Sequence, residues 1–179
     1  MDYKALQEHI HELAAYEDLI EHKYRLSDSD EAKLTLGLIY SVISVVGALG
    51  EHLSRNNAAM SQKELVGCIE SVIATTALCA LELELNYEQL HYTGMQLADS
   101  SCLADMQLAV MCAAGMLGDE CVYPQPEKEV ARQGGTMISN ALGCLYKTVE
   151  LEVVEAVMTE FMAKTDDDFG GEPLDVHSL

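Results

Sequence analysis

Residues 61–85 read SQKELVGCIESVIATTALCALELEL, and this stretch decides the fold class that we expect. Ser61 and Glu64 form the S-x-x-E pattern of a capping box, which marks the start of a helix. The residues that follow are apolar on almost every side, as is typical of a helix buried in a protein core. The final Leu-Glu-Leu-Glu-Leu alternates as a strand would, but its neighbours keep helical spacing. We therefore predict that the helix continues to about Leu85.

The rest of the chain has the same helical character. Its 179 residues include no Trp, two Phe and three Pro, a composition that favours helix over sheet. We therefore predict an all-α protein, an antiparallel helical bundle with one domain over residues 1–164 and a flexible acidic tail over residues 165–179. Caps and apolar spacing place the other helices at about residues 2–26, 31–54, 86–97, 99–122, 126–151 and 155–164. The last of these is either a separate helix or a continuation of the helix before it.

The charge of the chain argues against several classes of partner. There are 30 Asp and Glu against 10 Lys and Arg, a net charge of -20, whereas direct binding to nucleic acid or to an anionic membrane needs a basic surface. Residues 34–50 carry no charged side chain, but this run is shorter than the roughly 20 residues that cross a bilayer. We expect a buried helix there. We also expect a cytoplasmic protein, because the first residues lack the basic start and apolar run of a secretory signal.

The sulfur-containing side chains are expected to be structural. The six cysteines form no C-x-x-C pair, and most fall on apolar helix faces, so we expect free thiols that are mostly buried. The methionines are interpreted as core residues, with a methionine-lined ligand cavity as the alternative. The methionines in question are at positions 95, 106, 111, 116, 137, 158 and 162.

An internal repeat is visible when the chain is shifted by about 68 residues along itself. Residues 46–51 then align with residues 114–119. The alignment continues without a gap, and Gly67 meets Gly135 and Ser71 meets Ser139. Nine identities result over residues 34–95, where random pairing gives about four. We predict two tandem repeats of a helical hairpin unit, about 34–97 and 102–164, with the N-terminal helix as an addition. Two generic Ala/Leu/Gly helices are the alternative.

The repeat unit resembles a known family in three places. Residues 47–51, Gly-Ala-Leu-Gly-Glu, are similar to a Gly-Glu-x-Gly-Glu pattern on one helix, and residues 64–67, Glu-Leu-Val-Gly, to a Glu-x-x-Asp pattern on the next. Residues 84–90 resemble the turn into a short following helix. The unit looks like the MazG-like all-α nucleoside triphosphate pyrophosphohydrolases, over about residues 34–97. The resemblance implies a homodimer or a larger homo-oligomer, as is usual in that family.

The resemblance also implies a metal site. Carboxylates at i and i+3 share a helix face, and two such pairs can hold Mg²⁺ against a polyphosphate. Here Ala48 and Gly67 stand where acids are expected, which leaves Glu51 and Glu64 as the metal ligands. No cofactor other than Mg²⁺ is implied.

The incomplete acid pattern shapes the function that we expect. Two carboxylates hold Mg²⁺ poorly, so we expect a divergent MazG-like protein that binds a nucleotide or other small ligand between its helices. Whether it also acts as a metal-dependent nucleoside triphosphate pyrophosphohydrolase stays open. The alternative is a non-enzymatic module whose acidic surface binds a basic protein.

Glu70 is the most informative isolated charge. Its neighbours one helical turn away are apolar, and a buried carboxylate is costly unless it is paired, bound to metal or protonated. One interpretation places Glu70 with Glu51 and Glu64 in a ligand-binding pocket. The others place it at an oligomer edge or in a bond to a buried Ser or Thr.

Two Glu-x-x-His pairs add a further hypothesis. They are Glu8 with His11 and Glu88 with His91, and di-iron bundles use this motif together with two more Glu. Chance placement in a chain this rich in Glu also produces such pairs. A di-iron site is therefore the least favoured of the three functional hypotheses.

Overall fold

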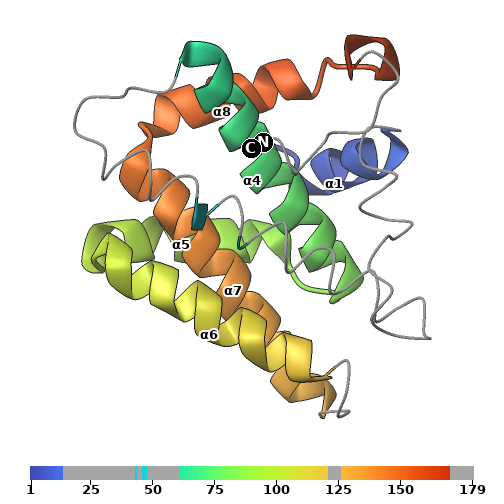
Figure 1. Ribbon diagram of the computed structural model, residues 1–179. Coiled ribbons are helices and arrows are strands. Elements are labelled where there is room, and N and C mark those ends of the chain that lie inside the picture. The colour runs from blue at the N-terminus through green and yellow to red at the C-terminus, as the bar shows by residue number, and fades with distance from the viewer. Residues whose placement is uncertain (14–42, 44–45, 48–60, 121–125, 170–179) are drawn as a thin grey trace.

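The computed structural model describes residues 1–13, 43, 46–47, 61–120 and 126–169. Within these residues the chain is helical and contains no strand, so the prediction of an all-α helical bundle is confirmed (Figure 1). The elements are α1 (Tyr3–Glu12), α4 (Gln62–Glu82), α5 (Tyr87–Ser100), α6 (Leu103–Glu120), α7 (Glu127–Thr148), α8 (Leu151–Phe161) and the short 3-10 helix η2 (Asp166–Phe169).

The bundle is organised around α7 and α4. Helix α7 packs against α4, α5 and α6, and α6 lies beside it as the other arm of a hairpin (Figure 1). Helix α4 also contacts α1 and α8. The buried apolar side chains of α4 and α7 make up the centre of the core: Ile69, Val72, Ile73, Ala77, Met137, Ile138, Ala141, Leu142 and Leu145.

Two glycines allow α5 and α7 to cross closely. A Cβ atom added at Gly94 of α5 would lie 2.8 Å from the Cβ of Leu142 and 3.0 Å from the backbone oxygen of Ser139. A Cβ added at Gly143 of α7 would lie 3.3 Å from both the backbone oxygen of Gly94 and the Cβ of Leu97. Real Cβ contacts are rarely this short, so the absence of side chains at both positions lets the two helices approach.

Helix α4 ends inside the Leu-Glu-Leu-Glu-Leu stretch, which is the end of a helix as predicted and not a strand. The helix stops at Glu82, and a Schellman turn follows, in which the Leu85 N–H donates to the Ala80 oxygen at 2.8 Å. Glu84 takes a positive φ of 52° at the position where glycine is usual. The turn packs on α7, because a Cβ added at Gly134 would lie 2.3 Å from a methyl carbon of Leu83.

Helix α4 also has the length and composition of a membrane span. Its apolar window covers Lys63–Glu82, and 72% of that window is buried inside the protein. Burial of this kind is typical of the central helix of a bundle. The other apolar run, residues 34–50, lies outside the described residues apart from positions 43, 46 and 47.

Several predicted helix bounds are wrong. The helix expected over residues 2–26 ends at Glu12, because Leu13 adopts an extended conformation and buries its side chain. The helix expected over residues 126–151 ends at Thr148, and α8 starts at Leu151 instead of residue 155. Helix α5 runs to Ser100 instead of residue 97. Tertiary burial outweighs the weak local preferences on which these bounds rest.

The prediction for sulfur-containing side chains is confirmed in part. Cys68, Cys79 and Cys144 are buried free thiols, whereas Cys102 and Cys112 are exposed. Met106, Met137 and Met158 are core residues, but Met111 and Met116 lie on the exposed side of α6. Helix α6 is apolar on two sides, and only one of them faces α7, so composition did not identify the buried side.

Candidate ligand pocket between α1 and α5

The first turn of α1 is fixed by its cap and by a contact with α4. The Asp2 carboxylate accepts hydrogen bonds from the backbone N–H groups of Lys4 and Ala5, each at 3.1 Å. Farther along the helix, the side-chain amide of Gln7 donates to the backbone oxygen of Ala77 at 3.0 Å. These bonds hold the N-terminal end of α1 beside the turn that joins α4 to α5.

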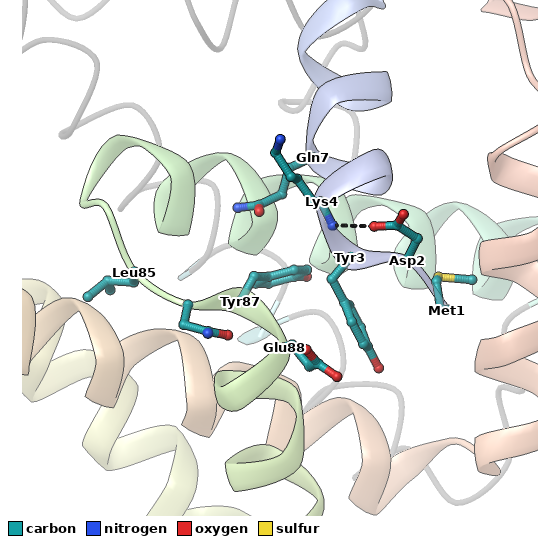
Figure 2. Close-up of a pocket in the computed structure, with 9 residues that line it drawn as sticks. Met1, Asp2, Tyr3, Lys4, Gln7, Leu85, Tyr87 and Glu88 are labelled. Atoms are coloured by element: carbon teal, nitrogen blue, oxygen red, sulfur yellow. Dashed lines mark hydrogen bonds between the residues drawn. The ribbon is translucent and has the colours of Figure 1, made fainter.

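A pocket of about 490 Å³ lies between that end of α1 and the start of α5 (Figure 2). Its volume is within the range of about 300–1,000 Å³ that is usual for small-molecule sites. Five of its nine lining residues are polar or charged, and two tyrosines, one methionine and one leucine make up the rest. The lining residues are Met1, Asp2, Tyr3, Lys4, Gln7, Leu85, Asn86, Tyr87 and Glu88.

Tyr87 forms a rigid part of the pocket wall. Its hydroxyl donates to the backbone oxygen of Ile73 at 3.0 Å and lies 2.7 Å from the Thr76 hydroxyl. Burial raises the pKa of Tyr87 above its usual value. The Tyr3 ring meets the Tyr87 ring edge-on, with the ring centroids 6.1 Å apart. Two aromatic side chains from distant parts of the sequence therefore line one side of the pocket.

His91 lies directly behind this aromatic wall. Its ring centroid is 4.7 Å from that of Tyr3 and 4.6 Å from that of Tyr87, and its Nδ1 is hydrogen-bonded to the Tyr146 hydroxyl. The Nε2 atom is buried and has no hydrogen-bond partner among the described residues. Burial lowers the pKa of His91 to about 3, so the imidazole is neutral at ordinary pH and buried without a countercharge.

The polar groups around the pocket differ in whether they are already bonded. Lys4 pairs with Glu8 at 3.3 Å. Glu88 is exposed on the pocket wall, and within the described part of the chain no hydrogen bond or ion pair engages its carboxylate. Burial is the largest cause that raises the pKa of Tyr3. The charges of nearby groups, Glu88 and Glu155 among them, raise it further. Glu88 is therefore the unbonded acid of the pocket lining among the residues described.

Of the three predicted site residues, the structure describes Glu64 and Glu70, and these two lie apart. Glu51 lies outside the described residues. Glu64 is exposed, and its carboxylate accepts hydrogen bonds from the Ser61 N–H and hydroxyl, each at 2.7 Å, which lower its pKa. Glu70 is only 8% exposed and pairs with Lys164 at 2.5 Å. Six residues along a helix separate Glu64 from Glu70 by about 9 Å in height, on different sides of the helix.

The surroundings of Glu64 and of the Glu88/His91 pair do not suit the expected metal sites. No group of three or more His, Cys, Asp or Glu side chains that could hold a metal ion is found in the described part of the chain. Glu64 is bonded within its own capping box, so it does not present the several open carboxylate oxygens that Mg²⁺ requires. Of the Glu88/His91 pair, His91 is buried against Tyr146 whereas Glu88 is exposed, which is not the arrangement of a di-iron ligand pair.

Apart from Glu88, which the Glu-x-x-His pattern singled out as a possible metal ligand, the residues of the pocket were not identified from the sequence. Tyr87 and His91 are one helical turn apart on α5, which is the only signal that the local sequence gives. Tyr3 and Tyr146 reach them from α1 and α7. Contacts over such sequence distances have no signature in residue spacing.

Comparisons of the chain with protein families, with curated proteins and with solved structures found no match.

Proposed function

We propose that this protein binds a small organic ligand in the pocket between α1 and α5. The pocket itself carries this proposal, since its volume of about 490 Å³ suits a metabolite and its lining combines two tyrosines with five polar or charged residues. The hydrogen bonds of Tyr87 and the cap of α1 hold the two sides in place before any ligand arrives. A preformed site of this kind needs little ordering energy on binding.

We further propose that the protein is a divergent MazG-like protein in which ligand binding persists without efficient metal-dependent hydrolysis. The resemblance at residues 47–51 and 64–67 supports the first part. The second part is supported by Ala48 and Gly67 at the positions of two acids, and by the engagement of Glu64 in its capping box. The proposed ligand pocket does not contain Glu51, Glu64 or Glu70.

The tandem duplication belongs to the same proposal. With the 68-residue shift, α4 and α5 align with α7 and α8, and in both pairs a long helix precedes a shorter one. The matched residues Ser71 and Ser139 are both buried. These likenesses support two related units, of which the first begins outside the described residues.

A panel of metabolites tests the binding proposal. We expect at least one organic ligand to raise the melting temperature and to shift the NMR signals of residues 1–7 and 85–88. Tyr3→Ala should weaken that response by about tenfold, because it removes one aromatic wall. Leu108→Ala, an exposed change on α6, is the control and should leave binding unchanged. A panel of neutral, anionic and cationic ligands that shifts none of these signals would overturn the proposal.

Hydrolysis is tested separately. We expect no release of pyrophosphate above background when the protein is incubated with nucleoside triphosphates and Mg²⁺ or Mn²⁺. Turnover that depends on Glu51 and Glu64 would show instead that the acid pattern still holds a metal, and the protein would then be an enzyme.

An interaction module is the second candidate, because α6 has an exposed apolar side. Leu108 is 63% exposed, Met111 54% and Met116 48%. Exposed apolar clusters on a helix often mark contacts with another protein, and the family resemblance implies a homo-oligomer. We expect Leu108→Glu to leave the melting temperature nearly unchanged and to lower the mass measured by light scattering from that of an oligomer to that of a monomer. A monomeric wild-type protein would contradict this candidate.

A further inference from the structure

We propose that the ligand of the α1/α5 pocket is a small organic cation, such as a substituted ammonium, held between the ring of Tyr3 and the carboxylate of Glu88. This inference rests on the proposed function and specifies the ligand class of the same site. It follows from which polar groups at the pocket are already bonded and which are open.

The groups that would hold an anion are already engaged. The N-terminal ends of α1 and α5 both face the pocket, and helix N-termini attract anions through their free N–H groups. Here Asp2 accepts hydrogen bonds from the N–H groups of Lys4 and Ala5, and Asn86 accepts one from Gln89 at 3.0 Å. The side chain of Lys4 is paired with Glu8. A phosphate or carboxylate in the pocket would have to displace these bonds.

The groups that would hold a cation are open. Glu88 lines the pocket, and no hydrogen bond or ion pair is found for its carboxylate within the described residues. Figure 2 shows the Tyr3 ring extending toward Glu88 at one end of the pocket, and the charge of Glu88 acts on the Tyr3 hydroxyl. Ammonium groups bind to aromatic rings, and a carboxylate close to the ring adds a direct attraction between opposite charges.

The surrounding charge favours the same ligand class. Glu155 of α8 adds a second negative charge near Tyr3, and the whole chain carries a net charge of -20. Such a field draws cations toward the site and repels polyphosphates that lack bound metal. The α-amino group of Met1 is the one positive group at the pocket besides Lys4 among the residues described. The lining thus holds two acids and two positive groups, and Glu8 and Glu155 nearby make the surroundings negative.

A matched pair of ligands tests this inference. Choline and 3,3-dimethylbutan-1-ol have nearly the same shape, but only choline carries a positive charge. We expect choline to bind at least about tenfold more tightly by calorimetry, with shifts in the NMR signals of Tyr3 and Glu88. Adenosine triphosphate and inorganic phosphate, without added metal, should not bind at this site.

Variants locate the effect. Glu88→Gln keeps the size of the side chain and should reduce the preference for choline to about threefold or less, whereas Glu127→Gln, an exposed carboxylate at the start of α7, should leave it intact. Tyr3→Leu should weaken choline binding, and its melting curve shows whether it has folded. Equal binding of the two ligands, or binding of anions alone at the pocket, would overturn the cation inference while the proposed function stands. If no ligand of any class binds there, both fail.

Discussion

The Nζ atom of Lys164 lies 2.5 Å from the Oε1 of Glu70, and this ion pair joins the chain just beyond α8 to the middle of α4. Both side chains are largely buried, with the lysine side chain 29% and the glutamate side chain 10% exposed. The ammonium group also lies 6.0 Å from the centroid of the Phe161 ring. Glu70 is therefore a structural residue in this conformation, with its charge balanced inside the protein.

Removing Lys164 should destabilise the protein. Lys164→Met leaves the Glu70 carboxylate buried without its partner, and we expect the free energy of unfolding to fall by about 2 kcal/mol. Urea denaturation measures this loss. The double variant Glu70→Leu/Lys164→Met should recover most of it, because no charge is left buried. If the double variant is as unstable as the sum of the single variants, the pair does not act as proposed here.

The same pair shows what the sequence could and could not predict. The apolar neighbours of Glu70 indicated a buried carboxylate, which the structure confirms, but its partner is Lys164 and not a buried Ser or Thr. The partner is 94 residues away, beyond the end of a helix whose bounds were themselves predicted wrongly. The interpretation that grouped Glu70 with Glu51 and Glu64 had no information on which distant side chain reaches Glu70. The partner of a buried charge is decided by tertiary packing.

His91 should make the stability of the protein depend on pH. Burial lowers the pKa of the folded His91 to about 3, whereas a histidine in an unfolded chain titrates near about 6.5. Below pH 6.5 the unfolded chain therefore binds a proton that the folded chain does not, and stability is lost as the pH falls toward 3. Above pH 6.5 this contribution is constant. We expect a loss of about 2 kcal/mol between pH 7 and pH 5 from this residue.

The variant His91→Phe separates this effect from other titrations. The groups that face His91 are Tyr3, Tyr87 and Tyr146, and none of them changes charge between pH 5 and pH 7. Denaturation at pH 7 and at pH 5 measures how much the free energy of unfolding falls between them. This fall should be smaller by about 2 kcal/mol in the variant than in the wild type. The same loss in both proteins would mean that water or another group reaches Nε2 in the folded state.

The close crossing of α5 and α7 predicts opposite effects for two glycine variants. Gly94→Ala would place a methyl group 2.8 Å from the Cβ of Leu142, and we expect it to destabilise the protein by about 1–3 kcal/mol. Gly67→Ala is the matched control, since a Cβ there meets no atom within 4 Å. It lies inside α4 and should stabilise the protein by about 1 kcal/mol through helix propensity. Chemical denaturation of both variants measures the difference.

Both glycines also illustrate a limit of sequence-based prediction. The family resemblance places Gly67 where an acid is expected, and no pattern in the sequence distinguishes Gly94. The structure distinguishes them by what surrounds the missing Cβ, which is open space at Gly67 and another helix at Gly94. Helical character was predictable because apolar spacing and caps are local. The packing of one helix on another was not, because it depends on side chains distant in sequence.

The left-handed residue at the end of α4 offers a stabilising variant. Glu84 has a φ of 52° and an exposed side chain in the Schellman turn, a conformation that costs a residue with a Cβ atom about 1 kcal/mol relative to glycine. We expect Glu84→Gly to raise the free energy of unfolding by about 0.5–1 kcal/mol. Glu84→Ala should give no such gain, since alanine keeps the Cβ and loses only the charge. Leu83 and Leu85 of this turn pack beside Gly134 of α7, and Leu85 also lines the pocket. The substitution changes neither leucine, so the ligand affinity should stay unchanged. An equal gain from both variants in thermal denaturation would show that relief of acidic repulsion, and not backbone conformation, is the cause.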